Sequence, residues 1–271
     1  MLSGNFNGDS ENSRRGVTRL VCPYPYVGKI HPCLTTYPAE VSDVPALVTL
    51  DLWGIPPARV PGALLRMGLD RGHLRRTPGL RFAKLLGTGS GRTFTVGDAD
   101  PGHWGLLAVW ESTGAAAAFE AGPTVRGWSR LSRERLRVGL RPLASRGRWS
   151  RRLPFGEPDP SPYDGPVAAV TRARLAAAKA LTFWRAVPPV SADLQRSPGL
   201  RLAVGIGESP VGLQGTFSLW ESAAALTGFA HRGAAHVEAI RRTAEVGWYT
   251  EELFARFAVL SVEGTFAGRA P

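Results

Sequence analysis

The sequence predicts an α+β fold built of two tandem ferredoxin-like βαββαβ repeats, packed together as a dimeric α/β-barrel-type pair. Three observations support this prediction. The 271-residue chain repeats several motifs in the same order, each copy alternates strand-like with helix-like segments, and helices can cover only one face of each predicted sheet. Two such sheets bury their remaining apolar faces by packing against each other.

The internal duplication is visible in three pairs of matching segments: 76–89 with 196–209, 107–113 with 217–223, and 141–149 with 258–266. The first pair reads "RTPGLRFAKLLGTG" and "RSPGLRLAVGIGES", and the second reads "LAVWEST" and "FSLWESA". The order and the spacing agree, so the chain contains two copies of one unit.

The first copy begins with an apolar, β-rich strand at 46–53, followed by a helix within 56–76 that has an early proline at Pro61. Two strands then flank a glycine-rich loop, and a broken helix precedes the closing strand. These elements are expected at 80–87, 104–111, 112–137 and 138–145.

The second copy follows the same order. We expect a strand at 166–175, a helix at 176–195 interrupted by two prolines, strands at 200–208 and 215–222, a helix at 235–257 and a closing strand at 256–264.

The domain organisation follows from the two copies. Residues 1–44 form an irregular or disordered N-terminal arm, because Gly, Ser, Asn and Pro dominate there. The first repeat occupies 45–150, a Pro-rich linker 151–165 and the second repeat 166–271.

The net charge of +11 raises the question of nucleic-acid binding. The arginines are scattered among apolar residues without zinc-finger spacing or an RNA-binding aromatic motif, so we expect no nucleic-acid partner. No apolar run has the length of a membrane span, which favours a cytoplasmic protein. Association with a membrane is expected if the substrate is a lipid or a carotenoid.

The cysteines, Cys22 and Cys33, both lie in the N-terminal arm. The repeats therefore contain no disulfide, no cysteine metal site and no thiolate nucleophile. The segment "GTGSG" at 87–91 looks like a phosphate loop, but it joins two antiparallel strands and opens no helix. A nucleotide site is therefore not expected there.

The histidines are the remaining candidates for chemistry. His31, His73 and His103 are expected at the surface, the last in the hairpin loop. His236 lies near the start of a helix, where the first copy has Arg126, whereas His231 lies beside a glycine. A neutral imidazole on a helix beside an apolar sheet suits an axial haem ligand, and a partly exposed histidine without such a role is the alternative.

Several long segments together resemble the spheroidene monooxygenase family of carotenoid oxygenases: "FAKLLGTGSGRTFT", "GLRPLASRGRWSRRLPF", "YDGPVAAVTRARL", "ALTFWRAVPPVSADLQRSPGLRLAVGIGESP", "TFSLWES" and "HVEAIRRTAEVGWYTEELFARF". The resemblance covers roughly 46–266. It implies a haem b cofactor, molecular oxygen, a ferredoxin-type electron donor and a small apolar substrate. Because that family is similar in fold to aldoxime dehydratases, the resemblance also implies a haem-dependent dehydratase as the alternative activity. A non-catalytic haem-binding protein is a second alternative.

The same resemblance implies roles for particular residues. His236 is the expected iron ligand, with His231 in reserve. Cations expected near the haem propionates or the substrate are Lys84, Arg185 and Arg241, and aromatic residues expected to line the cavity are Trp184, Phe217, Trp248 and Tyr249. Ordinary core packing is the alternative for the aromatic residues. A homo-oligomer is compatible with this fold.

Overall fold

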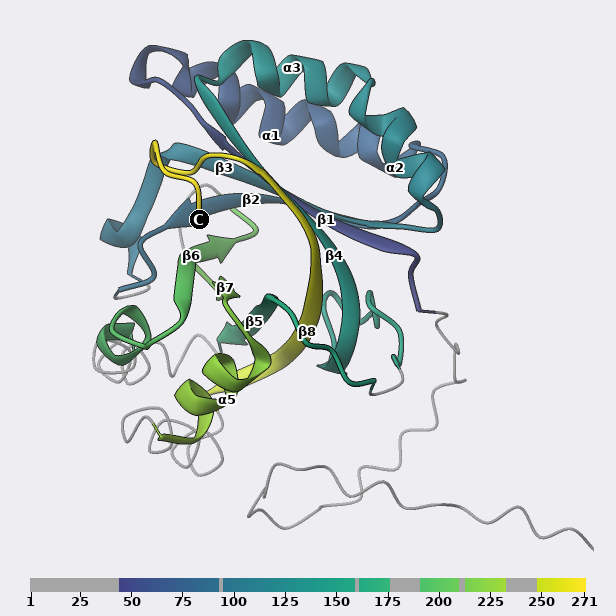
Figure 1. Ribbon diagram of the computed structural model, residues 1–271. Coiled ribbons are helices and arrows are strands. Elements are labelled where there is room, and N and C mark those ends of the chain that lie inside the picture. The colour runs from purple at the N-terminus through teal and green to yellow at the C-terminus, as the bar shows by residue number, and fades with distance from the viewer. Residues whose placement is uncertain (1–43, 93–94, 159–160, 176–190, 210–212, 233–247) are drawn as a thin grey trace, which may run out of the picture. The chain divides into compact units, whose positions relative to one another are not determined.

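The computed structural model describes residues 44–92, 95–158, 161–175, 191–209, 213–232 and 248–271. Eight strands in these ranges form one closed barrel in the order β1-β3-β2-β6-β7-β5-β8-β4, as Figure 1 shows. Every pair of neighbouring strands is antiparallel. Closure leaves no free strand edge, which is the usual liability of an antiparallel sheet.

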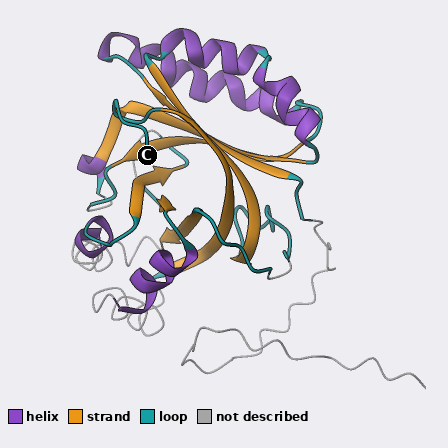
Figure 2. Ribbon diagram, in the orientation of Figure 1, coloured by secondary structure: helices purple, strands orange, loops and turns teal. Residues whose placement is uncertain are grey.

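The first half of the barrel contains four strands: β1 (Leu47–Gly54), β2 (Leu80–Gly89), β3 (Ala99–Trp110) and β4 (Glu134–Gly147). They pair in the order β4-β1-β3-β2. Its helical elements are η1 (Pro57–Arg59), α1 (Val60–Arg75), η2 (Val96–Asp98), α2 (Thr113–Glu120) and α3 (Pro123–Leu131). Helices α1 to α3 form a layer on the outside of the barrel (Figure 2).

The second half contains β5 (Val167–Leu175), β6 (Leu200–Gly207), β7 (Gly215–Trp220) and β8 (Tyr249–Gly264), with α5 (Ala223–Arg232) after β7. These strands pair in the order β8-β5-β7-β6. Two seams close the barrel. The β4–β8 seam is long, whereas β2 and β6 pair only at Gly87–Gly207, Thr88–Ile206 and Gly89–Gly205.

Two of the predicted helices extend too far. The helix expected at 112–137 is two helices that end at Leu131, and β4 already begins at Glu134. Residues 249–257, expected to be the last part of a helix, instead belong to β8, which begins at Tyr249. In both segments apolar residues alternate with charged ones, and the apolar set faces the barrel interior: Leu136, Val138, Leu140, Leu253, Ala255 and Phe257. This period of two is the signature of a strand.

Glycine is required at matching turns of the two halves. Gly79 has φ +71° and Gly199 has φ +77°, and a Cβ on either would lie within 3 Å of an alanine side chain, Ala115 or Ala225. The carbonyl of each glycine accepts a hydrogen bond from the residue after β3 or β7, at 3.0 Å from Glu111 and 2.8 Å from Glu221. An L residue is disfavoured at these φ values and has no room there.

The barrel interior is filled by apolar side chains from all eight strands. The segment that follows β4 contributes to it, since Trp149 and Phe155 are buried in the same cluster. A second cluster lies between the strands of the first half and helices α1 to α3, and it includes Trp53, Trp104 and Trp110. Trp128 of α3 stacks on Trp53 with ring centroids 5.3 Å apart. The helical layer is therefore held mainly by large aromatic surfaces.

Candidate functional site

A cluster of charged side chains occupies one end of the barrel interior. Arg172, on an inward-facing position of β5, is 1% exposed. Its Nη2 lies 2.7 Å from Oε1 of Glu208, which follows β6, and its Nη1 donates to Glu251 of β8. Lys84 Nζ of β2 lies 2.5 Å from Oε2 of Glu208. Three strands of the second half and one of the first therefore meet through ion pairs.

The cluster also holds the turn that follows β4. Lys84 Nζ donates to Ser150 Oγ at 2.6 Å, and Trp149 Nε1 donates to Glu208 at 2.8 Å. Glu251 accepts hydrogen bonds from the backbone N–H groups of Ser150 and Arg151, at 3.0 and 2.7 Å. Ser150 and Arg151 have φ values of 54° and 63°, a strained conformation for non-glycine residues that these contacts stabilise.

Both carboxylates of the cluster are ionised at neutral pH. Burial alone would raise the pKa of Glu208, but hydrogen bonds from Lys84 and Trp149 and the charges of Lys84 and Arg172 lower it below its ordinary value. Burial likewise opposes ionisation of Glu251, and the backbone donors of the turn together with Arg172 lower its pKa. Arg172 is therefore a buried cation between two anions.

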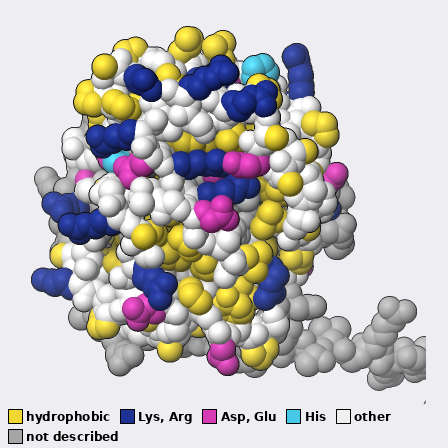
Figure 3. Space-filling view, turned by 45° about the horizontal axis from the view of Figure 1, so that its top comes forward, with side chains coloured by type: hydrophobic (Ala, Val, Ile, Leu, Met, Phe, Trp, Pro, Cys, Tyr) yellow, Lys and Arg dark blue, Asp and Glu magenta, His cyan; other side chains and the backbone are white. Residues whose placement is uncertain are grey.

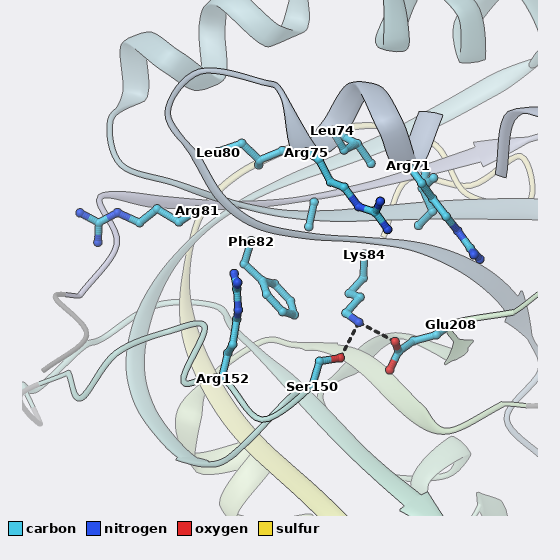
Figure 4. Close-up of a pocket in the computed structure, with 12 residues that line it drawn as sticks. Arg71, Leu74, Arg75, Leu80, Arg81, Phe82, Lys84, Ser150, Arg152 and Glu208 are labelled. Atoms are coloured by element: carbon cyan, nitrogen blue, oxygen red, sulfur yellow. Dashed lines mark hydrogen bonds and ion pairs between the residues drawn. The ribbon is translucent and has the colours of Figure 1, made fainter. Parts of the chain in front are cut away.

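A pocket of about 610 Å³ opens beside Lys84. Helix α1, strand β2, the turn after β4 and Glu208 enclose it, and its lining residues are Arg71, Leu74, Arg75, Leu80, Arg81, Phe82, Ala83, Lys84, Leu85, Ser150, Arg152 and Glu208. Figure 4 shows Arg71 and Arg75 descending from α1 toward Lys84, with Arg152 beside Phe82. The pocket combines several cations with one carboxylate that is already paired.

His103 is buried, contrary to its expected place in a surface loop. It lies in β3, is 7% exposed and contacts two carboxylates: Nδ1 is 2.6 Å from Asp100 Oδ2, and Nε2 is 3.3 Å from Glu134 Oε1. The loop prediction failed because β3 begins at Ala99, five residues before the predicted strand. Burial lowers the pKa of His103, but the two carboxylates outweigh it and raise the pKa overall. His73 is exposed, as expected.

On the outer side of the second-half strands, which α5 partly covers, lies the guanidinium group of Arg256. Trp220, Val167 and Ala258 form a small apolar cluster there, and Phe229 of α5 stacks on Trp220 at 5.6 Å. Arg256 pairs in register with Ala169 and lies on this side of β8. Its Nε is buried and has no hydrogen-bond partner among the residues that the structure describes. A buried guanidinium nitrogen without an acceptor is costly and suits an anionic ligand group.

The structure describes four of the eight predicted site residues. Lys84 lies in the charged cluster, Phe217 is fully buried in the barrel interior, Trp248 is buried, and Tyr249 begins β8 opposite Leu175. The placement of Phe217 agrees with the core-packing alternative. The other four predicted residues, His236, Arg185, Arg241 and Trp184, lie outside the described residues. His231 is in α5.

Sequence reasoning missed Arg172, Glu208, Glu251 and Arg256. A signal existed for Arg172, because Ala168 and Val170 occupy the inward positions of the same strand, so an arginine two residues further on is a charge on a core-facing position. No comparable signal marks Glu251, which lies in a segment that was expected to be helical.

The fold places the chain among known proteins. It is similar to an aldoxime dehydratase crystallised with butyraldoxime, with a TM-score of 0.53 and 12% identity over 81% of each chain. It is also similar to another aldoxime dehydratase, with a TM-score of 0.51 and 13% identity over 79% of this chain and 80% of that one. At these identities the likeness shows a shared ferredoxin-type barrel fold.

Sequence similarity identifies the class. No family model matches the chain, but it is 37% identical to spheroidene monooxygenase of Rhodobacter capsulatus over 78% of this chain and 89% of that protein. It is 42% identical to spheroidene monooxygenase of Rubrivivax gelatinosus over 71% of this chain and 73% of that protein. The barrel is therefore that of an oxidoreductase, a monooxygenase. The chain belongs to the spheroidene monooxygenase family.

Proposed function

We propose that this monooxygenase uses haem b to oxidise a small apolar substrate of carotenoid type, with O2 and electrons from an external ferredoxin-type donor. The observation that supports the proposal most strongly is the 37% identity that spans 89% of a spheroidene monooxygenase. Insertion of one oxygen atom into a C–H bond consumes two electrons and two protons and releases water, so an external reductant is required.

We further propose that residues 45–150 and 166–271 are two copies of a ferredoxin-like unit joined by the linker 151–165. Each half pairs its strands in the same relative order. The matching register pairs Leu47–Trp110 and Val167–Trp220 support this proposal.

This correspondence points to the second half as the cofactor site. On the outer side of the sheets, Trp53 of the first half corresponds by register to Ala173 of the second, and Leu106 to Thr216. Among the described residues, smaller side chains therefore occupy the outer side of the second-half strands at the positions where the first half carries Trp53 and Leu106. A flat, mostly apolar cofactor fits such a surface.

The donor groups of this surface also fit haem. Arg256 supplies a buried, unpaired guanidinium nitrogen for a propionate. We propose that His236 would bind the haem iron, with His231 as the alternative, and that Arg185 and Arg241 would contact the propionates. Trp184, Trp248 and Tyr249 are proposed to line the haem or substrate cavity, and Lys84 to supply a cation near the substrate. Phe217 faces the barrel interior and belongs to the core instead. When bound, haem supplies the iron at which O2 is activated.

The protein's own contribution is binding, orientation and exclusion of water. Apolar side chains such as Trp220 and Phe229 keep water from the surface that would receive the cofactor. A cytoplasmic location and a homo-oligomer complete the proposal. None of the helices within the described ranges has the length and apolar character needed to cross a membrane.

The decisive test is turnover of spheroidene by haem-supplemented protein under ¹⁸O2 with reduced ferredoxin. We expect one labelled oxygen atom in the first, hydroxylated product, detected by mass spectrometry, and no product without oxygen or reductant. The matched control is the same protein purified without haem. Turnover of an aldoxime without oxygen, together with inactivity toward spheroidene, would instead identify a dehydratase.

A further inference from the structure

The outer face of α1 exposes three leucines to solvent. Leu64, Leu65 and Leu69 are 45%, 62% and 60% exposed, and all lie within two turns of the helix. Between and beyond them, Gly68 and Gly72 have open space where a side chain would project. Large apolar side chains grouped on one exposed helix face mark an interaction surface.

The same helix ends in a group of arginines. Arg71, Arg75 and Arg76 are exposed on its last turn and just after it. Arg71 and Arg75 line the pocket beside Lys84, and Arg152 reaches the pocket from the turn after β4. The guanidinium groups of Arg71, Arg75 and Arg152 form no hydrogen bond or ion pair with any residue that the structure describes. Three unpaired cations from two separate elements around one pocket favour an anionic ligand.

We propose that α1 and the adjoining pocket dock the protein on an anionic phospholipid surface. In this arrangement Leu64, Leu65 and Leu69 enter the boundary between head groups and acyl chains. The pocket formed by Arg75 and Arg152 then receives a lipid phosphate. The proposal does not depend on the cofactor, although a membrane surface is where an apolar substrate would be met.

The charge of the helical layer supports a lipid partner. Among the described residues of this layer and its connections, the exposed basic side chains are Arg59, Arg71, Arg75, Arg76, Arg126, Arg130 and Arg133. The exposed acidic side chain is Glu111. Figure 3 shows hydrophobic and basic side chains together over the helices. An apolar helix face flanked by basic residues is typical of helices that lie in a membrane interface.

A second copy of the chain is a less suitable occupant. It would bring two strongly basic layers together, and each copy carries a net charge of +11. Like charges across an interface oppose association, whereas phospholipid phosphates neutralise them.

The backbone that presents these groups is fixed before any ligand arrives. Arg152 and Trp149 exchange two backbone hydrogen bonds, at 3.0 and 3.2 Å, and Glu251 holds the turn between them. Only side-chain freedom is lost on binding, which lowers the entropic cost.

Vesicle co-sedimentation of the full chain tests the proposal, with phosphatidylcholine vesicles compared with vesicles containing one third phosphatidylglycerol. We expect binding to the anionic vesicles that weakens as NaCl rises from 0.05 to 0.5 M. Because an arginine near an anionic surface contributes roughly fivefold in affinity, Arg75→Gln/Arg152→Gln should weaken binding by about tenfold or more. Leu65→Gln/Leu69→Gln should have an effect of at least similar size.

Matched controls are Arg201→Gln and Leu260→Gln, which change exposed residues of β6 and β8 and should bind as the parent does. Circular dichroism confirms that each variant is folded. Equal binding to both vesicle types, or full binding by both double variants, would overturn the proposal. So would calorimetric binding of inorganic phosphate without sedimentation on vesicles, or self-association through α1 detected by light scattering.

Discussion

Arg172 and Glu208 form an ion pair of 2.7 Å at one end of the barrel interior. Arg172 is 1% exposed and pairs at the same time with Glu251. Through these two carboxylates it links β6 to β8, and through Glu208 it reaches Lys84 of the first half. The narrow β2–β6 seam, with three residue pairs, is therefore reinforced by charge.

Replacing Arg172 by alanine should destabilise the protein strongly. Two partly buried carboxylates would lose their shared, fully buried cation, and breaking a buried ion pair from one side costs about 3 kcal/mol or more of the free energy of unfolding. Urea denaturation followed by circular dichroism measures the loss. Arg174→Ala, an exposed change on the same strand, is the control. A loss below about 1 kcal/mol for Arg172→Ala would contradict the bridging role.

The stability of the protein should depend on pH through His103. Its folded-state pKa is raised above the ordinary 6.5, so its protonated form is stabilised by Asp100 and Glu134. That contribution is complete below pH about 6.5 and is lost as the pH rises through the raised pKa. Unfolding measured at pH 5.5, 7 and 9 should show a decline that is smaller in His103→Gln. Parallel pH profiles for both proteins would refute this assignment.

Arg256→Gln should weaken haem binding without unfolding the protein. The substitution removes the buried cation proposed to meet a propionate, and loss of one charge-assisted hydrogen bond reduces affinity by roughly tenfold or more. Haem titration followed by absorbance gives the dissociation constant. Arg146→Gln, at a side chain 60% exposed on the neighbouring strand β4, serves as the control. Equal haem affinity in the two variants would show that Arg256 does not contact the haem.

Much of this fold could be predicted from the sequence, because the strands are marked locally by apolar, β-rich runs. Strands β2, β5, β6 and β7 begin within one residue of the predicted positions. The failures share a physical cause. In β4 and β8 the outward positions hold arginine and glutamate, residues that are equally common in helices, and only the closed barrel decides between the two periods.

The candidate site is less predictable for a related reason. Lys84, Glu208 and Glu251 are far apart in the sequence and meet only because β2, β6 and β8 reach the same end of the barrel. His103 looked like a loop residue because one of its partners, Glu134, is brought to it only by the β1–β3 and β1–β4 registers, whereas Asp100 lies three residues earlier on the same strand. Tertiary pairing of this kind leaves no local pattern.

Haem titration of the parent protein, His236→Ala and His231→Ala tests the central claim most directly. We expect one haem per chain and a Soret band for the parent and for His231→Ala, and loss of both for His236→Ala. Absence of haem binding by the parent would contradict the haem proposal. Full haem content in His236→Ala, together with loss of haem in His231→Ala, would identify His231 as the iron ligand instead.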